Sequence, residues 1–432
     1  MKIIDVIIMG FGDRGQIYAS YAQKQPQLMR IVGVVEPNDL RREKAAKLYN
    51  LNADMCFSDP EAFFALPKLC DAVINATMDC IHYKTTVPLL QKGYNVLLEK
   101  PVTANPGELL HLRDLARRHN VVLMVCHVLR YAPFYQRIKE LLRARSIGAI
   151  INLHLSEHVA IPHMLSSYVR GKWNSERKSG SGMLMAKCCH DIDLMVWLLD
   201  SRPKQVSSMG GRSVFTAKKK PGGAADRCLD CRYMEACIYS AKKLYIDNDA
   251  FPFLVWQDVP GKDWDSVSKE QRIQLLSTVN PHGECAYQDN DLVDHQSVTA
   301  VFENGEIATL NMVGGASKAG RYIHIVGTHG EIEGNLESDF FTLRKFDAAA
   351  LQPAEQTIRI TEDVSGAHSG GDLRLAADFI SVLRGDGRSV SCTDIDDSVT
   401  GHLLAIGAEK SRKENVFVNY DEFERPKVKR GK

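Results

Sequence analysis

A glycine-rich turn near the N-terminus has the spacing that suits binding of a pyrophosphate. It reads Gly10-Phe11-Gly12-Asp13-Arg14-Gly15, follows a largely apolar run at 2–9 and precedes an amphipathic stretch at about 16–25. In this G-x-G-x-x-G pattern the first glycine permits a tight turn, the second admits phosphates to the backbone, and the third lets helix pack on strand. We therefore predict that these six residues bind a dinucleotide. A glycine-rich turn in an unrelated α/β protein is the alternative.

An acidic residue follows the next apolar run at the distance expected for a ribose ligand. Glu36 comes directly after the predicted strand at 31–35, about 20 residues beyond the glycine turn. A carboxylate there accepts hydrogen bonds from the ribose hydroxyls and favours NAD. Arg41 and Arg42 lie a few residues on, where they pair with a 2′-phosphate or are solvated helix residues. NAD is the prediction, and NADP is the alternative.

A lysine follows another predicted strand, in the tripeptide Glu99-Lys100-Pro101 after 95–98. Beside an oxidised nicotinamide ring the charged form of a buried lysine is disfavoured. Such a lysine can exchange a substrate hydroxyl proton while hydride leaves the same carbon. Pro101 stiffens the backbone at this point. The alternative is a lysine that extends from a strand end into solvent.

Four of the eleven cysteines form a spacing typical of a metal site. Cys228-x-x-Cys231 is followed by Cys237, and Cys285 lies further along the chain. Four thiolates suit tetrahedral zinc in a structural role, because they leave no open coordination position. An iron–sulfur cluster and four free thiols are the alternatives. The loop-like stretch at 218–223 precedes the set, so we predict an insertion at about 216–290 that this metal stabilises.

The residues of the first half lie on alternating strands and helices. Apolar runs at 2–9, 31–35, 72–76, 95–98 and 121–126 predict strands, and helices are predicted between them, as at about 106–119. In a parallel sheet the carboxyl ends of the strands meet at one edge, where ligands bind. We expect the glycine turn, Thr77, Lys100 and His127 at that edge. The predicted fold of 1–126 is a Rossmann-type, doubly wound parallel sheet.

The second half has the pattern of an α+β domain. Helices are predicted at 132–145 and 182–199, and the strand at 150–159 lies between them. Asn304-Gly305 between runs at 295–303 and 306–313 is a strong hairpin signal, and strands at 321–327, 332–336 and 341–346 continue the meander. We predict a domain at 127–423 with a large, mostly antiparallel sheet. A basic tail at 424–432 is predicted to be disordered.

The motifs together resemble the Gfo/Idh/MocA family of NAD(P)-dependent sugar and cyclitol oxidoreductases. The resemblance runs from Ile3 to about Ala408 and rests on the glycine turn, Glu99-Lys100-Pro101 and the helix motif His190-Asp191-x-Asp193. It implies that Lys100 and His190 are catalytic acid–base groups. Many members have an acidic residue four positions before the histidine, but here that position is Ala186. Lys187 lies on the same helix face, and we include it as a candidate.

The resemblance also implies contacts around these groups. Beyond the glycine turn and Glu36, the predicted cofactor contacts are Arg41, Thr77, His82, Glu99 and Lys100. The predicted substrate contacts are His127, Arg170, Trp173, Asp193 and His368. Trp173 is alternatively a cover for a core edge, and His368 with Asp372 is alternatively a helix cap. We assign Cys188 and Cys189 to packing.

These features predict an enzyme that transfers hydride from a ring carbinol of a carbohydrate or glycoside, at C3, to NAD. The alternative is an NAD-dependent glycoside hydrolase that oxidises C3, eliminates the aglycone, adds water and reduces the ring again. Lys187 beside His190 would supply the additional proton carrier. A third hypothesis is a non-catalytic, NAD-sensing regulator.

Composition narrows the classes of partner. The 432 residues have a net charge of +1, with 44% apolar and 25% charged residues, so no strong field favours nucleic acid or an anionic membrane. No apolar run is long enough to span a membrane, and the stretch 1–9 lacks the features of a secretion signal. We expect a cytoplasmic chain that forms a homodimer or homotetramer and binds neither nucleic acid nor membrane.

Overall fold

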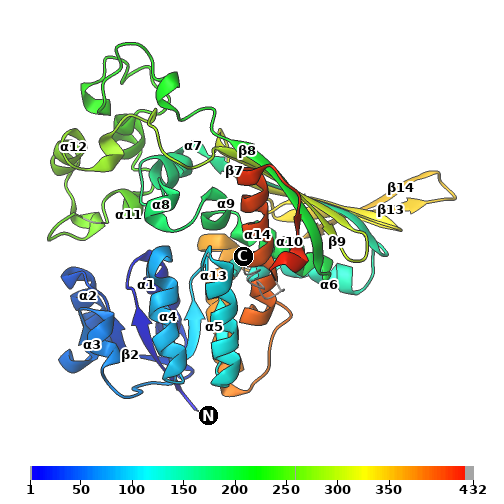
Figure 1. Ribbon diagram of the computed structural model, residues 1–432, viewed down its shortest axis with the longest axis horizontal. Coiled ribbons are helices and arrows are strands. Elements are labelled where there is room, and N and C mark those ends of the chain that lie inside the picture. The colour runs from blue at the N-terminus through cyan, green and yellow to red at the C-terminus, as the bar shows by residue number, and fades with distance from the viewer. Residues whose placement is uncertain (1, 258, 424–432) are drawn as a thin grey trace, which may run out of the picture.

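The computed structural model describes residues 2–257 and 259–423 and contains two sheets (Figure 1). The N-terminal sheet is entirely parallel in the order β3-β2-β1-β4-β5-β6, which is the Rossmann order predicted from the sequence. Its strands are β1 (Ile4–Met9), β2 (Met29–Val35), β3 (Cys56–Phe57), β4 (Ala72–Asn75), β5 (Asn95–Leu98) and β6 (Leu123–Val125). The carboxyl ends of β1, β4, β5 and β6 therefore share one edge of this sheet.

Helices cover both faces of the parallel sheet. They are α1 (Asp13–Lys24), α2 (Asp39–Tyr49), α3 (Pro60–Phe64), α4 (His82–Gln91) and α5 (Pro106–Arg118). Asn105 caps α5 by accepting from two backbone amides, and Pro106 occupies the first turn, where no donor is lost. One apolar cluster joins the sheet to α1, and a second joins its other face to α4 and α5. Burial on both faces explains why the strands are continuous apolar runs.

The second sheet is large and mostly antiparallel, as predicted. Its order is β14-β13-β12-β11-β7-β10-β9-β8-β15, and only the pair β7 and β10 is parallel. The strands are β7 (Ile150–Ala160), β8 (Pro203–Gly211), β9 (His295–Phe302), β10 (Ile307–Ala316), β11 (Gly320–Gly327), β12 (Gly330–Asn335), β13 (Phe340–Asp347), β14 (Gln352–Arg359) and β15 (Val418–Asn419). The sequence missed β3, β8, β14 and β15. β14 carries almost only exposed residues and has no apolar alternation to find.

The helix predicted at 182–199 is two helices. α9 (Met183–Ala186) ends before Lys187, and α10 (Cys189–Leu199) begins after Cys188. In a continuous helix the Ala186 carbonyl would accept from the amide of His190. Here that carbonyl accepts from Lys100 Nζ at 2.7 Å, so a tertiary hydrogen bond stands at the break. The other helix of this region, α6 (Pro133–Arg143), follows the prediction closely.

The C-terminal helices connect the two sheets. α13 (Gly371–Arg384) packs against α1, and α14 (Ile395–Glu414) packs against α5, α10 and β8 (Figure 1). Two helices from the C-terminal part of the chain thus pack on the N-terminal domain. The predicted boundary at residue 126 divides the sequence but not these packed elements. The predicted basic tail at 424–432 lies outside the described residues. No helix within 2–257 and 259–423 is both long and apolar enough to cross a bilayer.

The segment between β8 and β9 is an insertion outside the sheet. It spans 212–294 and contains α11 (Pro252–Val255) and α12 (Lys269–Ser277) around a small core with Trp256, Tyr245 and Leu276. Figure 1 shows it beyond one end of the large sheet. It contacts α2, since the Gln257 carbonyl accepts from Arg41 at 2.9 Å and Asp263 pairs with Lys44 at 2.7 Å.

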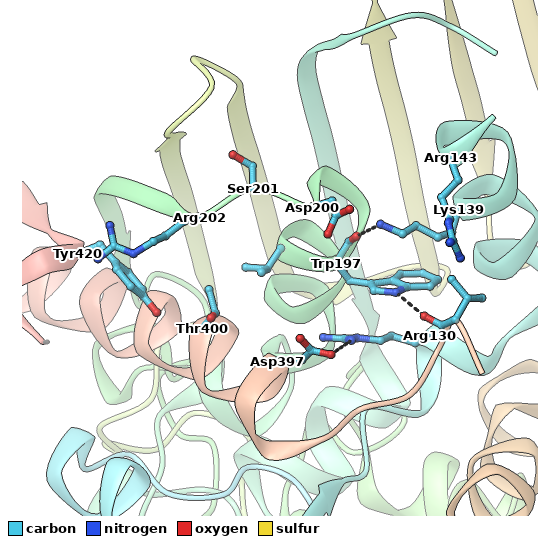
Figure 2. A pocket seen from close by; sticks show the side chains of 12 residues that line it. Arg130, Lys139, Arg143, Trp197, Asp200, Ser201, Arg202, Asp397, Thr400 and Tyr420 are labelled. Atoms are coloured by element: carbon cyan, nitrogen blue, oxygen red, sulfur yellow. Dashed lines mark hydrogen bonds and ion pairs between the residues drawn. The ribbon is translucent and has the colours of Figure 1, made fainter. Parts of the chain in front are cut away.

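A buried ion pair fixes α10 to the turn Val128–Tyr131. Arg130 is 2% exposed and donates from Nε and Nη2 to the two carboxylate oxygens of Asp193, at 2.7 and 2.6 Å. Its Nη1 donates to the Cys392 carbonyl at 3.3 Å. Arg130 also lines an open cavity of about 520 Å³ at the C-terminal end of α10, with Trp197 and Lys139 (Figure 2). This cavity lies beyond the predicted site residues.

Arg130→Met should destabilise the fold by about 3–5 kcal/mol, because it leaves the Asp193 carboxylate buried without a partner. Arg137→Met is the matched control, since Arg137 pairs with Glu140 on the exposed face of α6. The control should change the free energy of unfolding by less than about 1 kcal/mol. Urea unfolding followed by circular dichroism measures both. Equal effects would contradict the assigned role of the buried pair.

Candidate active site

The glycine turn has the geometry that a pyrophosphate requires. Gly10 has a φ of 87°, and a Cβ there would lie 2.5 Å from the Ala76 carbonyl oxygen. A Cβ at Gly15 would lie 2.0 Å from the Gly10 carbonyl oxygen, so this glycine lets α1 pack closely. A Cβ at Gly12 would meet no atom within 4 Å. The turn is therefore open at its second glycine, at the N-terminus of α1, which fits a dinucleotide phosphate.

Glu36 lies at the carboxyl end of β2, beside the turn. Its carboxylate accepts from the Phe11 amide at 2.7 Å and from the Asn38 amide at 2.9 Å. The Phe11 ring is buried in the core against Tyr49. The Arg41 guanidinium reaches the insertion, and Arg42 donates to the Glu36 carbonyl. The structure thus places a carboxylate beside the glycine turn, where the ribose is predicted, and turns both arginines to protein partners.

The Glu99 carboxylate connects the glycine turn to the lysine loop. Its Oε1 accepts from Arg14 Nε at 2.7 Å and from the Tyr18 hydroxyl at 2.8 Å, and its Oε2 accepts from the Lys100 amide at 2.7 Å. Burial would raise the pKa of Glu99, but the charges of Arg14 and Lys100 outweigh it and the pKa is lowered. Arg14 also pairs with Asp372 on α13. Both Glu99 and Arg14 therefore brace the turn from within the protein.

Lys100 and His190 lie together where the two domains meet. Lys100 Nζ donates to the Ala186 carbonyl at 2.7 Å, one helical turn before His190. Burial, and then the charge of Lys100, hold the pKa of His190 well below its usual value. The His368 ring lies 5.5 Å from the His190 ring, and its Nδ1 is 3.1 Å from Asp372 Oδ1. His190 Nδ1 is buried and has no hydrogen-bond partner among the described residues.

A second charged group surrounds Lys187. Its Nζ lies 3.2 Å from Glu157 Oε1 on β7, and Arg321 Nε lies 2.7 Å from Glu157 Oε2 and 3.1 Å from Asp191 Oδ1. Burial lowers the pKa of Lys187, and Glu157 only partly opposes this. Burial also raises the pKa of Asp191 to about 6, against the opposing charge of Arg321. Lys187 and Asp191, whose pKa values shift toward neutrality, can exchange protons beside His190, whereas the Arg321 guanidinium stays charged.

His163 is a site residue that the sequence analysis missed. Burial lowers its pKa to about 2, and the charges of Lys187, Arg321, Lys100 and His368 act in the same direction. His163 therefore stands among the cations of the site and stays neutral. Glu157 and Arg321 were missed as well, because they occupy ordinary positions on β7 and β11. Only the ion pair between Glu157 and Arg321 distinguishes these residues, and no local sequence pattern predicts a pair between such distant positions.

Three predicted residues hold the loops after β4 and β5. His82 makes contacts at 2.7 Å with the Pro101 carbonyl and at 3.0 Å with the Thr77 carbonyl. The Thr77 hydroxyl donates to Asn75 at the end of β4. Trp173 is partly buried against the core, and its indole donates to Asp79 at 3.1 Å. These contacts join the loops of the parallel sheet to the second domain.

Of three residues predicted to contact substrate, Asp193 and Arg170 have protein partners, and His127 is buried without a hydrogen-bond partner among the described residues. Both carboxylate oxygens of Asp193 accept from Arg130, and His127 lies 3.7 Å from Asp193 with 1% exposure. Arg170 is directed into the insertion, where it donates to the carbonyls of Glu284 and Tyr239. Their position beneath the site differs from our expectation. A sequence shows that such a side chain is polar but not which way it points.

The comparisons with known proteins agree with this geometry. The sequence model of an oxidoreductase family matches twice, with its NAD-binding Rossmann fold at residues 4–127 and its C-terminal alpha/beta domain at 139–419. The Bacillus subtilis protein YteT, which carries an oxidoreductase name, is 24% identical over 72% of this chain and 72% of its own length.

A second sequence relative and a solved structure are also similar to this chain. The 2,7-anhydro-N-acetylneuraminate hydratase of Mediterraneibacter gnavus is 22% identical over 49% of this chain and 53% of its own length. The structure of a levoglucosan dehydrogenase with NADH and levoglucosan superposes with a TM-score of 0.69. It is 15% identical and covers 97% of this chain and 100% of its own, so this likeness shows the fold.

Gly12→Ala should weaken NAD binding by about tenfold or more, or about 1.4 kcal/mol, because its methyl group occupies the phosphate side of the turn. Its free energy of unfolding should change by less than about 0.5 kcal/mol, since no protein atom is contacted. Gly15→Ala should instead lose about 1–3 kcal/mol of stability. Isothermal titration with NAD and urea unfolding test both. A destabilised Gly12→Ala chain with unchanged affinity would refute the assignment.

The free energy of unfolding should vary with pH because of Asp191, over the range between the pKa values of this residue in the folded and unfolded chain. A raised pKa means that the folded state holds the proton more tightly, so stability is gained as pH falls and lost as pH rises. With a folded value of about 6, the gain from about pH 7 to about pH 5 is about 1 kcal/mol. Asp191→Asn should lack it. Urea unfolding across this range measures the difference, and parallel profiles would contradict the assignment.

Proposed function

Because the chain belongs to the Gfo/Idh/MocA oxidoreductase family, we propose that it moves hydride between a carbohydrate or glycoside ring carbinol and NAD. The reacting carbon in this proposal is C3. One observation carries it: Lys100 and His190 meet at the carboxyl edge of the parallel sheet, with Lys100 Nζ fixed 2.7 Å from the Ala186 carbonyl. A nicotinamide held by the glycine turn extends along that edge.

The two basic groups have complementary roles in this proposal. The Lys100 ammonium donates a hydrogen bond to the substrate oxygen and stabilises the negative charge that develops there. His190 is neutral, because burial and the charge of Lys100 lower its pKa, and it accepts the hydroxyl proton. NAD, when bound, would supply the hydride acceptor for the same carbon. The carbinol thus becomes a carbonyl as one hydride and one proton leave.

NAD fits the ribose position better than NADP. The Glu36 carboxylate at the end of β2 would repel a 2′-phosphate and can accept from the ribose hydroxyls. Arg41 and Arg42 are engaged with the Gln257 and Glu36 carbonyls, so neither is held ready for a phosphate. We therefore assign NAD as the cofactor.

The face of the large sheet away from α10 and α14 supports a homo-oligomer. It carries apolar side chains that are exposed in the single chain, among them Ile151, Ile307, Val313 and Tyr322. An apolar patch of this kind is typical of a protein contact. We propose that this face joins two copies in a homodimer or homotetramer.

The second candidate function is an NAD-dependent glycoside hydrolase, which the group around Lys187 favours. After oxidation at C3, the hydrogen at C2 is acidic, and a base removes it as the aglycone leaves C1. Water then adds at C1, and the C3 ketone is reduced again, so NAD is regenerated. Lys187, with its pKa lowered by burial and with Glu157 at 3.2 Å, supplies a proton carrier beyond Lys100 and His190.

Incubation with glycosides and a trace of NAD distinguishes the two reactions. The dehydrogenase should produce NADH in proportion to ketone and stop when NAD is consumed. Free sugar formed in excess of NAD, without accumulation of NADH, would assign the hydrolase instead. Lys100→Met should lower kcat by at least about 100-fold in either case, whereas the exposed Lys204→Met control should not. Unchanged NAD binding with no turnover of any sugar would leave the regulator hypothesis.

Lys187→Met separates the candidates further. For the dehydrogenase it should leave hydride transfer within about tenfold of the wild type, because Lys100 and His190 suffice. For the hydrolase it should block aglycone release while single-turnover NADH formation continues. Loss of both steps together would contradict a separate role for Lys187.

A further inference from the structure

Four cysteines from separate parts of the insertion line one small cavity. They are Cys228, Cys231, Cys237 and Cys285. An antiparallel bridge between Arg227 and Glu284, and a hydrogen bond from the Cys285 amide to the Asp226 carbonyl, bring the distant fourth cysteine to the first three. The fold therefore brings Cys285 next to the three cysteines from which it is distant in the sequence.

A buried cation without a counter-ion stands at the same cavity. Arg170 is 1% exposed, and within the described residues its guanidinium contacts two carbonyls and Cys228 Sγ at 3.3 Å. Its Nη1 has no hydrogen-bond partner there, and no described carboxylate pairs with it. An unpaired buried charge costs several kcal/mol, so the site lacks a negative charge. Thiolates at the cysteines would supply it.

Backbone amides point at two of the sulfur atoms. The Tyr239 amide donates to Cys237 Sγ at 3.4 Å, and the Tyr287 backbone hydrogen-bonds to Cys285. In both cases the donor lies two residues after the cysteine. Hydrogen bonds to a thiolate favour its charged form, as in metal sites whose ligands are held by an outer layer of donors.

From these contacts we infer that the four cysteines bind one zinc ion as a structural centre of the insertion. Four thiolates around a divalent cation have a net charge of −2, which Arg170 partly neutralises. The cavity measures about 30 Å³, the volume of about one water molecule. A single ion fits this space.

Binding requires the thiols to turn toward the cavity centre. Among the described residues, no three His, Cys, Asp or Glu groups stand at the mutual distances of metal ligands, and Cys228 Sγ contacts the Glu284 carbonyl at 3.5 Å. Rotation of a cysteine between staggered rotamers moves its sulfur without moving the backbone. The core of the insertion is small, so a metal that fixes these rotamers contributes directly to its folding.

Elemental analysis of the full chain, purified under reducing conditions without chelator, tests this inference. We expect one zinc per chain in the wild type. Cys231→Ser and Cys285→Ser should each reduce the zinc content at least about tenfold relative to the wild type, since each removes a ligand. Cys56→Ser is the matched control, because Cys56 is also a partly exposed free thiol but lies in β3. Retention of zinc in all three variants would overturn the proposal.

Cobalt substitution avoids dependence on the folding of any variant. The wild-type chain is stripped with chelator, reduced and titrated with Co²⁺, and its absorption spectrum is recorded. Intense thiolate-to-cobalt charge transfer and tetrahedral ligand-field bands, saturating at one cobalt per chain and displaced by Zn²⁺, are expected. No such bands, or iron with acid-labile sulfide in the purified protein, would overturn the assignment. Neither readout depends on the oxidoreductase activity.

Discussion

The geometry of the whole site depends on the hydrogen bonds that one buried carboxylate, Glu99, accepts. Arg14, Tyr18 and the Lys100 amide all donate to it within 2.8 Å. Arg14 and Tyr18 both belong to α1, which begins at the glycine turn, and the third donor belongs to the loop of the lysine. Because an unpaired buried charge is costly, these parts cannot move independently. Arg14 extends the constraint to Asp372, so the C-terminal helix α13 is held to the same arrangement.

The same limit on buried charge determines the protonation of the substrate side. Lys100, Lys187 and Arg321 bring positive charge to a region where Glu99, Glu157 and Asp191 supply opposing carboxylates. The neighbouring histidines therefore remain neutral, with the pKa of His163 lowered to about 2 by burial and by these cations. The cations that lower the pKa of an imidazole also weaken it as a base, but they stabilise an oxygen that becomes negative as its proton leaves. The arrangement thus suits removal of a hydroxyl proton from an uncharged sugar.

Local patterns in the sequence predicted the parts of the fold that local physics controls. The glycine turn, the buried parallel strands and the Asn304-Gly305 hairpin depend on neighbouring residues and were found at nearly their observed positions. The break at Lys187 could not be found, because it stands where Lys100 takes the Ala186 carbonyl from 86 residues away. Arg170 was assigned to the substrate from the family resemblance, and only the fold reveals that it enters the insertion. The Glu157 and Arg321 pair was invisible for the same reason.

The insertion bears on how the cofactor could be exchanged. It reaches α2, the helix after Glu36, through the Arg41 and Gln257 contact and the Lys44 and Asp263 pair. In that pair the side chains are 40% and 41% exposed, so it contributes about 1 kcal/mol or less. Contacts of this strength order the insertion against the N-terminal domain without locking it there. A dehydrogenase must release its cofactor in every cycle, and a weak contact beside the N-terminal domain permits movement there. A hydrolase that regenerates NAD has no such need, so the weak contact favours the dehydrogenase as the first of the two proposals.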